Sequence, residues 1–262
     1  METALGAGYR IEREVRPAGS CRRLVARDLV SGGEVLVKVL PTDLALAIDP
    51  DGLERRLLSI SSRLEDPRVV KSLAAGMAGP YLYYVRPFVP GTTLRAKLDK
   101  KGEMALLGAV HLFRTLLEIL DYAHSRGVLH GDLRPDNVLL SEGSTAVAEF
   151  GLISALVDSA REGSADRVGV SLADRKYLSP ERAGGNGLPT AGDDVYAVGA
   201  MAYEMLAGDV PDAQAGWDAS VLRESIPSRL SAIVARCLEP DPGSRWRRPG
   251  EVLEALDRAL GV

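Results

Sequence analysis

Residues 130–140 read His130-Gly131-Asp132-Leu133-Arg134-Pro135-Asp136-Asn137-Val138-Leu139-Leu140, which sets a carboxylate, a cation and a carboxamide at fixed offsets. The apolar residues 128–129 before this stretch and 138–140 at its end predict a short buried strand on either side. Glycine and proline punctuate the segment between them, as they do in tight loops. We therefore expect the side chains of Asp132, Arg134 and Asn137 to face one cavity, which is the geometry of an active-site loop.

The composition is that of a globular protein. Of the 262 residues 46% are hydrophobic, which is enough to bury the core of one large domain or of two small lobes. The 32 basic and 36 acidic residues give a net charge of −4. The sequence has no block of basic residues that would bind a nucleic-acid backbone or an anionic membrane, so we expect neither partner.

The cysteines and the apolar runs indicate the compartment. Cys21 and Cys237 are far apart and lack the spacing of metal ligands, so the sequence predicts neither a disulfide framework nor a zinc site. No apolar run approaches the roughly 18 residues of a membrane span, and residues 1–10 lack a signal pattern. We expect a soluble chain in the reducing cytoplasm, which could be a piece of a longer protein.

The first third of the chain has the pattern of short strands with one helix. Alternating or continuous apolar residues predict strands over 23–27, 35–40 and 81–85. Apolar residues at helical spacing predict a helix over about 53–64, which a proline then stops. The proline-rich segment 86–91 reads as a stiff connector, and we place a lobe boundary there.

The rest of the chain has the pattern of long helices. Apolar periodicity predicts helices over about 105–126, 193–206, 228–238 and 249–260, and the second of these is apolar almost all round, as a central buried helix should be. The stretch 153–176 lacks periodicity and is rich in Gly, Ser, Asp and Arg. We expect a long functional or mobile loop there.

From residue 9 to residue 260 the chain resembles the eukaryotic-like serine/threonine protein kinases of bacteria, through an ordered series of motifs. The stretch quoted above resembles their catalytic loop. That resemblance implies that Asp132 accepts the proton of a substrate hydroxyl, Arg134 faces the transferring phosphate and Asn137 holds Mg²⁺. Lys38, in the run Val-Leu-Val-Lys, matches the strand lysine that pairs with the phosphates of ATP.

The resemblance implies an α+β, bilobal protein-kinase-like fold. A small antiparallel β N-lobe with one main helix would occupy residues 1–86, a hinge 86–91, and a larger, mainly α-helical C-lobe 92–262. It also implies the cofactors ATP and Mg²⁺. Within the hinge, Arg86, Phe88 and Val89 would line the nucleotide site.

Further motifs resemble the metal site and the scaffold of the C-lobe. Glu149-Phe150-Gly151 stands where the magnesium-binding Asp-Phe-Gly would be, so Glu149 and Asn137 are the implied metal ligands. Ser179-Pro180-Glu181 resembles the motif that closes the activation segment. Asp194 matches the buried aspartate of the central helix, and Arg245 matches the late arginine that pairs with Glu181.

Where the family has a glycine-rich loop, this chain carries side chains. Arg16, Ala18 and Cys21 occupy the three glycine places. Glycine is needed there so that backbone N–H groups can approach the phosphates closely. We expect the side chains to hold the loop away from a nucleotide, although Arg16, Arg22 and Arg23 carry charge that attracts phosphate.

Other departures fall on the chemistry. Leu57 stands where a glutamate should pair with Lys38, and the nearest carboxylate on that helix is Glu54. In Glu149 the extra methylene moves the oxygens, while magnesium demands near-ideal octahedral geometry. Asp174 replaces a threonine and sets a second carboxylate near Asp132, which should raise one of their pKa values.

Gly131 and Arg86 also depart from the family pattern. Gly131 replaces the arginine that, in many kinases, interacts with a phosphorylated activation segment. Arg86 falls at the position that guards the pocket behind adenine, and an exposed arginine at a strand end remains the alternative. If Arg86 points inward it lies near Lys38, and two such cations need a carboxylate. We predict that Arg86 or Lys38 pairs with Glu149 and closes the site.

Three functions are compatible with these residues. The number of changed parts favours a pseudokinase, which binds ATP weakly or not at all and serves as a regulatory or scaffolding module. Its partner would be a protein, such as another kinase, a substrate or a signalling domain. The first alternative is an active, atypical Mg-ATP-dependent serine/threonine kinase with Asp132 as its base. The second is a small-molecule phosphotransferase of kinase-like fold.

Overall fold

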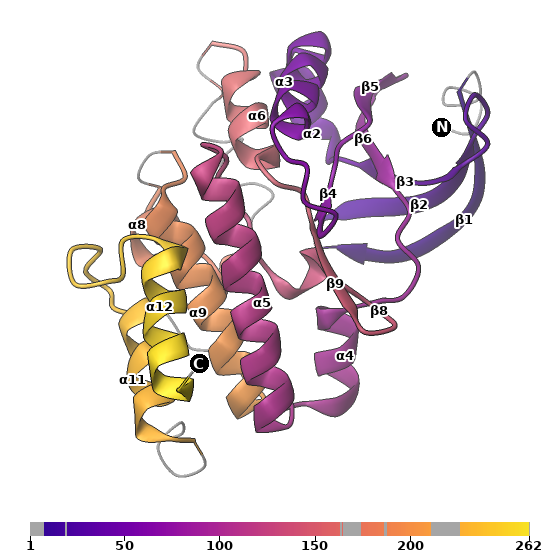
Figure 1. Ribbon diagram of the computed structural model, residues 1–262. Coiled ribbons are helices and arrows are strands. Elements are labelled where there is room, and N and C mark those ends of the chain that lie inside the picture. The colour runs from indigo at the N-terminus through magenta and orange to yellow at the C-terminus, as the bar shows by residue number, and fades with distance from the viewer. Residues whose placement is uncertain are drawn as a thin grey trace.

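The computed structural model describes residues 8–18, 20–162, 164, 174–185, 188–210 and 226–261. An N-terminal lobe built on a sheet adjoins a mainly helical C-terminal lobe, and Figure 1 shows the sheet on the right and the helices on the left. The α+β bilobal architecture predicted from the sequence is therefore confirmed. Within the described residues, no helix is long and apolar enough to span a bilayer.

The N-lobe sheet has five antiparallel strands in the order β1-β2-β3-β6-β5. In chain order these are β1 (Tyr9–Ala18), β2 (Cys21–Asp28), β3 (Glu34–Val39), β5 (Ala74–Ala78) and β6 (Tyr81–Pro87). Arg23 and Tyr84 lie opposite Lys38, and Arg86 lies opposite Leu36. Because paired residues, and residues two apart on a strand, share one face of a sheet, all five side chains belong to the same face.

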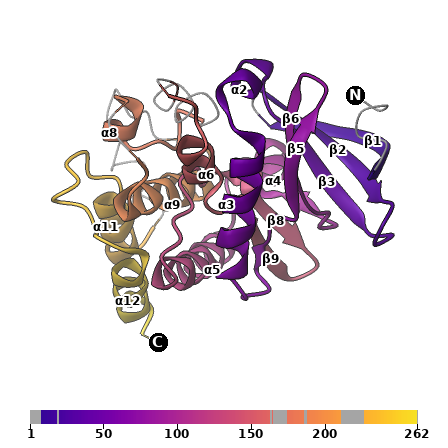
Figure 2. The same cartoon turned by 90° about the horizontal axis from the view of Figure 1, so that it is seen from above.

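Two helices follow β3. They are α2 (Thr42–Ala47) and α3 (Pro50–Ser62), and α3 begins with a proline, which suits the first helical position because it has no N–H to leave unpaired. Figure 2 shows α3 between α6 (Leu152–Asp158) and the sheet. The helix predicted over 53–64 is confirmed, but it begins three residues earlier, and α2 is an addition that the sequence analysis did not predict.

A second, small sheet lies between the two lobes. Its order is β4-β9-β8-β7, with β4 parallel to β9 and the other pairs antiparallel. The strands are β4 (Val69–Val70), β7 (Thr92–Thr93), β8 (Val138–Ser141) and β9 (Ser144–Ala148). β8 confirms the strand predicted at 138–140, at the end of the 130–140 stretch. The strand predicted at 128–129 is wrong, because this segment leads from helix α5 (Leu106–Ser125) into the loop and pairs with no described strand.

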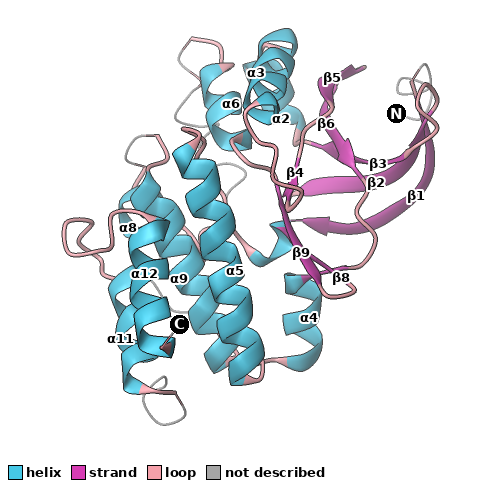
Figure 3. Cartoon of the chain, viewed as in Figure 1, coloured by secondary structure: helices cyan, strands magenta, loops and turns pink. Residues whose placement is uncertain are grey.

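The C-lobe core is helical (Figure 3). α9 (Ala191–Ala207) is buried along most of its length, starts at a Thr190–Asp193 capping box and ends at Gly208. The four long predicted helices are confirmed to within two residues at each end. The helices of this lobe are α4 (Leu94–Lys101), α5 (Leu106–Ser125), the short η1 (Pro135–Asn137), α8 (Pro180–Ala183), α9, α11 (Ser228–Cys237) and α12 (Pro249–Leu260).

The long loop predicted over 153–176 is wrong at its start. Helix α6 covers Leu152–Asp158 and buries Leu152, Ile153, Ala155 and Leu156 in the N-lobe core. These four apolar residues have helical spacing, but the run is too short to stand out from its Gly- and Ser-rich surroundings. Residues 163 and 165–173 of the predicted loop lie outside the described residues.

Candidate active site

A buried carboxylate from α9 holds the backbone of the 130–140 stretch. Asp194 accepts hydrogen bonds from the backbone N–H groups of His130 at 2.7 Å and of Gly131 at 2.8 Å. Its carboxylate also lies 2.8 Å from Nε2 of His124. Burial alone would raise the pKa of Asp194, but His124 and the N–H donors outweigh burial and hold the pKa below its ordinary value. Asp194 thus has the structural place that the sequence predicts.

Gly131 is required by the shape of this loop. Its φ of +80° lies in the left-handed region, which residues with a Cβ rarely adopt. A Cβ at this position would also come within 3.0 Å of the Pro189 side chain. In this conformation, position 131 has no room for the arginine that many kinases carry there.

The three polar residues of the loop do converge. Nε of Arg134 lies 3.4 Å from Oδ2 of Asp132, and Nδ2 of Asn137 donates to the backbone carbonyl of Asp132 at 3.0 Å. Burial raises the pKa of Asp132 to about 6, even though Arg134 and Lys38 act against it. Asp174 adds to the rise, as predicted, but burial is the larger cause.

Lys38 and Glu149 form a buried ion pair. Nζ of Lys38 lies 2.6 Å from Oε2 of Glu149, and the two side chains are 1% and 4% exposed. Burial would raise the pKa of Glu149, but Lys38 and Arg134 outweigh it and lower that pKa to about 2. The prediction that Arg86 or Lys38 pairs with Glu149 is confirmed for Lys38. Glu54 instead accepts a hydrogen bond from the backbone N–H of Ala75 at 3.3 Å.

The backbone at Glu149 is unusual as well. With φ of 74°, Glu149 is the one non-glycine residue of the described segments that has a positive φ. Such a conformation costs about 1–3 kcal/mol and persists where the surroundings determine it. Strain is thus concentrated at the residue that pairs with Lys38.

The predicted pair of Glu181 and Arg245 is also present. Nη1 of Arg245 lies 2.8 Å from Oε1 of Glu181, and the Arg245 side chain is completely buried. Its guanidinium also donates to the backbone carbonyls of Gly192 and Glu239, at 3.0 and 3.1 Å from their oxygens. The pair joins α8, which contains Glu181, to the loop before α12.

Comparison with known proteins identifies the family. A family model described as a protein kinase domain matches residues 24–255. The chain belongs to the protein kinase family.

Relatives of this protein kinase include serine/threonine-protein kinase PknB of Mycolicibacterium smegmatis, 32% identical over 254 residues that cover 89% of this chain and 40% of that protein. A probable serine/threonine-protein kinase of Clostridium acetobutylicum is 28% identical over 269 residues, covering 97% and 40%. The chain spans about 40% of the length of these relatives. The kinase domain of Mycobacterium tuberculosis PknI shares the fold, with a TM-score of 0.75 at 22% identity and coverage of 98% and 97%.

In this protein kinase domain Leu57 is a core residue. Leu57 of α3 is buried in one apolar cluster with Leu53 of the same helix and with Leu152 and Leu156 of α6. The backbones are joined too, since the N–H of Asp49 donates to the carbonyl of Ser159 at 2.9 Å. The face of α3 that would offer a glutamate to Lys38 is therefore packed against the helix that follows Glu149-Phe150-Gly151.

Of the charged residues around the turn between β1 and β2, Arg22 lies away from the cleft, whereas Arg16 and Arg23 line a hollow in it. Arg16 lies 2.6 Å from Asp99 of α4, in an exposed ion pair. Arg22 forms another exposed ion pair on the N-lobe surface. Cys21 is buried in the N-lobe core. The side chain of Ala18, the remaining glycine replacement, lies outside the described residues.

Two buried arginines lie on the same face of the N-lobe sheet as Lys38. Arg86 is 5% exposed, so the alternative of an exposed strand-end arginine is wrong. Arg23 is 7% exposed and, with Arg86, Phe88 and Val89, lines a hollow of about 290 Å³. The sequence analysis named Arg23 only as a charge that attracts phosphate, and not as a residue that lines this hollow beside Arg86. The position of Arg23 directly across from Lys38 was the signal, but that required the strand register.

The predicted magnesium ligands do not fit a metal in this arrangement. The carboxylate of Glu149 is paired with Lys38, and the amide N–H of Asn137 donates to the backbone carbonyl of Asp132. Among the residues that the structure describes, no group of three or more His, Cys, Asp or Glu side chains could hold a metal ion. A metal at this place would have to compete with an ammonium group for Glu149.

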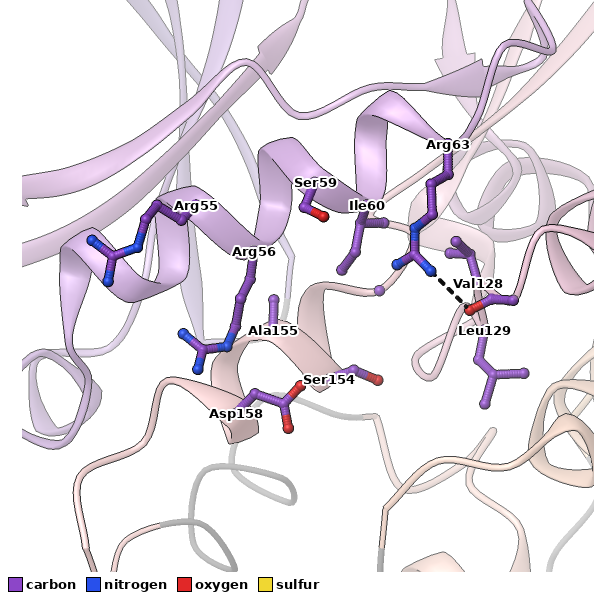
Figure 4. A pocket seen from close by; sticks show the side chains of 12 residues that line it. Arg55, Arg56, Ser59, Ile60, Arg63, Val128, Leu129, Ser154, Ala155 and Asp158 are labelled. Carbon is purple, nitrogen blue, oxygen red and sulfur yellow. Dashed lines mark hydrogen bonds between the residues drawn. The ribbon is translucent and has the colours of Figure 1, made fainter.

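A larger hollow, of about 570 Å³, lies away from Lys38 and Asp132, between α3, residues 127–129 and α6. Figure 4 shows Arg55, Arg56 and Arg63 along α3, with Arg56 pointing toward Asp158 of α6 and Arg63 toward the segment of Val128 and Leu129. Nη1 of Arg63 lies 3.5 Å from the Gly127 carbonyl. This hollow is polar and open, and it contains none of the residues assigned to phosphoryl transfer.

Proposed function

We propose that this protein kinase domain is a pseudokinase that binds ATP weakly or not at all and transfers little or no phosphate to serine or threonine. The observation that carries the proposal is the buried Lys38–Glu149 pair. One partner corresponds to the lysine that binds the nucleotide phosphates and the other to the carboxylate that binds Mg²⁺. Because each neutralises the other, ATP and its metal would have to separate a desolvated ion pair in order to bind.

Three further departures act on the same step. Leu57 sits in an apolar cluster, so α3 offers Lys38 no carboxylate at the family's position. Side chains replace the glycines of the phosphate loop. Arg23 and Arg86 bring buried charge to the place of a neutral purine. Phosphoryl transfer depends almost entirely on positioning and charge neutralisation, so these changes compound.

The function that remains is regulatory or scaffolding, with a protein as partner. The C-lobe supports this because it keeps the parts that hold its shape, namely the Glu181–Arg245 pair and the Asp194 contacts to the loop. Another kinase, a substrate of one, or a signalling domain would be the binding partner. The relatives named above are serine/threonine-protein kinases, which act on proteins.

The second candidate is an atypical active kinase with Asp132 as its base. It is favoured by the convergence of Arg134 and Asn137 on Asp132, and by burial, which raises the pKa of Asp132 to about 6. A carboxylate with that pKa can accept a proton near neutral pH. The family match and the Glu181–Arg245 pair favour a protein kinase over a small-molecule phosphotransferase.

The test is a thermal-shift titration with ATP, with and without Mg²⁺, followed by a radiolabel assay on a generic protein substrate. We expect no magnesium-dependent shift and no labelling above that of Asp132→Asn. Glu149→Asp alone should leave turnover absent, because the other departures remain. Strong magnesium-dependent labelling that Asp132→Asn abolishes would establish the active kinase instead.

A further inference from the structure

The hollow at the adenine end of the cleft is lined by four arginines and, among its described lining residues, by no aspartate or glutamate. Arg13 and Arg16 come from β1, Arg23 from β2 and Arg86 from β6. The rest of the lining is largely apolar: Val15, Leu36, Phe88, Val89, Gly91, Thr92, Thr93, Ala96 and Leu139. A purine site in which the charged lining is entirely cationic calls for a different ligand.

The carboxylates around the hollow neutralise only part of the positive charge of these four arginines. Arg16 is paired with Asp99, outside the hollow. Nη2 of Arg23 lies 3.8 Å from Asp136, beyond hydrogen-bonding distance, and its two hydrogen bonds go to the carbonyls of residues 16 and 17. Arg13 stacks over the Phe88 ring, 5.1 Å from its centroid.

Of the two buried arginines, Arg86 is the less satisfied, with one hydrogen bond against two for Arg23. Its Nη1 donates to the backbone carbonyl of Pro87 at 3.0 Å, and its Nε has no hydrogen-bond partner among the described residues. The side chain is 5% exposed, so water does not replace the missing acceptor freely. A guanidinium carries five N–H donors, and leaving such donors buried and unpaired is costly. Arg23 adds to that cost, because like charges in one low-dielectric cleft repel each other.

We propose that the adenine end of this cleft binds a small organic oxyanion, a phosphate ester or a carboxylate, with its charged group held by Arg86 and Arg23. The planar guanidinium fork matches the two oxygens of such a group and forms strong charge-assisted hydrogen bonds. Val15, Leu36 and Leu139 would cover the apolar body of the ligand.

Size and charge separate this ligand from ATP. A volume of about 290 Å³ is at the lower end for small-molecule sites, so it suits a compact anion. Adenine is neutral and supplies no counter-charge to Arg86. The inference rests on the proposed function in one respect, namely that a purine does not already fill this place.

The probes are phenyl phosphate and benzoate, which share a planar apolar body and differ in the oxyanion, with benzamide as the neutral match for benzoate. Binding to the full chain is measured by thermal shift and calorimetry at constant ionic strength, because salt screens charge attraction. The variants are Arg86→Met, Arg86→Lys and Arg23→Val. Arg258→Met, which removes an exposed arginine on α12, is the control for loss of one positive charge.

We expect at least one oxyanion to bind and benzamide not to bind. Arg86→Met and Arg23→Val should weaken binding by about tenfold or more, whereas Arg258→Met should leave it unchanged. Arg86→Lys keeps the charge without the fork and should fall between, so it serves if Arg86→Met fails to fold. Which oxyanion binds tells whether the natural ligand carries a phosphate or a carboxylate.

The proposal is overturned if neither oxyanion binds, or if binding is equal in the native chain and in folded Arg86→Met. Adenosine and Mg-ATP, titrated in parallel, separate this failure from failure of the proposed function. Tight adenosine or Mg-ATP binding by the native chain would overturn both. Absence of adenosine, Mg-ATP and oxyanion binding would overturn the oxyanion site alone and leave the pseudokinase proposal standing.

Discussion

Lys38 and Glu149 compensate for one another at the scale of single residues. A buried lysine without a carboxylate would be costly, and the glutamate that should come from α3 is replaced by Leu57. The longer side chain of Glu149, set on a left-handed backbone, supplies the counter-charge instead. The family's nucleotide chemistry and the stability of the N-lobe therefore make opposite demands on the same two side chains.

The first prediction concerns pH. Folding lowers the pKa of Glu149 from 4.5 to about 2, so the carboxylate contributes stability above pH 4.5 that is lost as the pH falls toward 2. At 1.36 kcal/mol per pKa unit this amounts to about 3 kcal/mol. Glu149→Gln should therefore be less stable than the native chain at pH 7 by roughly 3–5 kcal/mol, and the gap should narrow below pH 4.

The measurement is urea unfolding of both proteins between pH 7 and pH 2.5. Glu142→Gln, in an exposed turn, serves as the control for loss of a negative charge. A gap that stays constant over the whole pH range would show that Glu149 is not ionised against Lys38.

The second prediction concerns Arg86 and nucleotide affinity. Arg86→Met removes a buried cation and leaves an apolar side chain of similar length at the adenine end. We expect ATP to bind about tenfold more tightly to the variant, since a neutral purine no longer meets a buried guanidinium whose Nε has no acceptor. Side-by-side ATP titrations check this, and equal affinity would leave the altered phosphate loop as the reason for weak binding.

At the scale of elements, α3 and α6 behave as one packed unit. Leu53 and Leu57 of α3 meet Leu152 and Leu156 of α6, and the backbone N–H of Asp49 is bonded to the segment just after α6. Figures 1 and 2 both show the two helices side by side. The apolar residue at the place of the family glutamate is thus explained by packing.

The third prediction follows from this packing. Leu57→Glu would place a carboxylate in the apolar cluster while Glu149 already holds Lys38. We expect the variant to be destabilised by about 2–5 kcal/mol, similar to Leu57→Ala, and to gain no kinase activity. Urea unfolding and the radiolabel assay measure the two effects. Native-like stability together with new ATP turnover would show that α3 can move to form the family pair.

The fourth prediction concerns the Glu181–Arg245 pair, which holds α8 in place. Arg245→Ala leaves Glu181 without its partner and removes the donors to the carbonyls of Gly192 and Glu239. We expect a loss of about 3–5 kcal/mol, which lowers the melting temperature by on the order of 10 °C. Arg247→Ala, two residues away and exposed, is the matched control. Equal melting temperatures for the two variants would contradict the prediction.

At the scale of the whole molecule, ion pairs cross the cleft between the lobes. Arg16 of β1 reaches Asp99 of α4, and Arg23 of β2 approaches Asp136 of η1. The first pair is exposed at the mouth of the cleft and the second lies deeper. Together they draw the N-lobe sheet toward the C-lobe, over the hollow in which a purine would sit.

The fifth prediction uses salt to separate exposed from buried pairs. Asp99→Asn should lower the free energy of unfolding by about 1 kcal/mol or less, because Asp99 and its arginine partners are partly solvated. In 1 M NaCl, where the Debye length is about 3 Å, this loss should vanish. The loss caused by Arg245→Ala should persist there. Thermal unfolding in low and high salt measures both, and a salt-insensitive Asp99→Asn effect would refute the idea.

The sequence by itself predicted the bilobal fold and the convergence of polar residues in the 130–140 loop. The helical periodicity of α5 and α9, the alternation in β2 and β3, and the offsets within the 130–140 stretch are all carried by neighbours along the chain. Backbone geometry converts such spacing directly into faces and loops. The family motifs then placed Lys38, Asp194 and the Glu181–Arg245 pair.

The tertiary structure decided which charges meet. The sequence offered Glu54 and Glu149 as partners for the cations of the cleft, and only the packed lobes show that Lys38 takes Glu149 while Arg86 stays buried without a carboxylate. It likewise required the strand register to bring Arg23 across from Lys38, and the docking of α6 to make Leu57 a core residue. Contacts between segments far apart in the chain depend on packing and strand register, and local residue patterns predict neither.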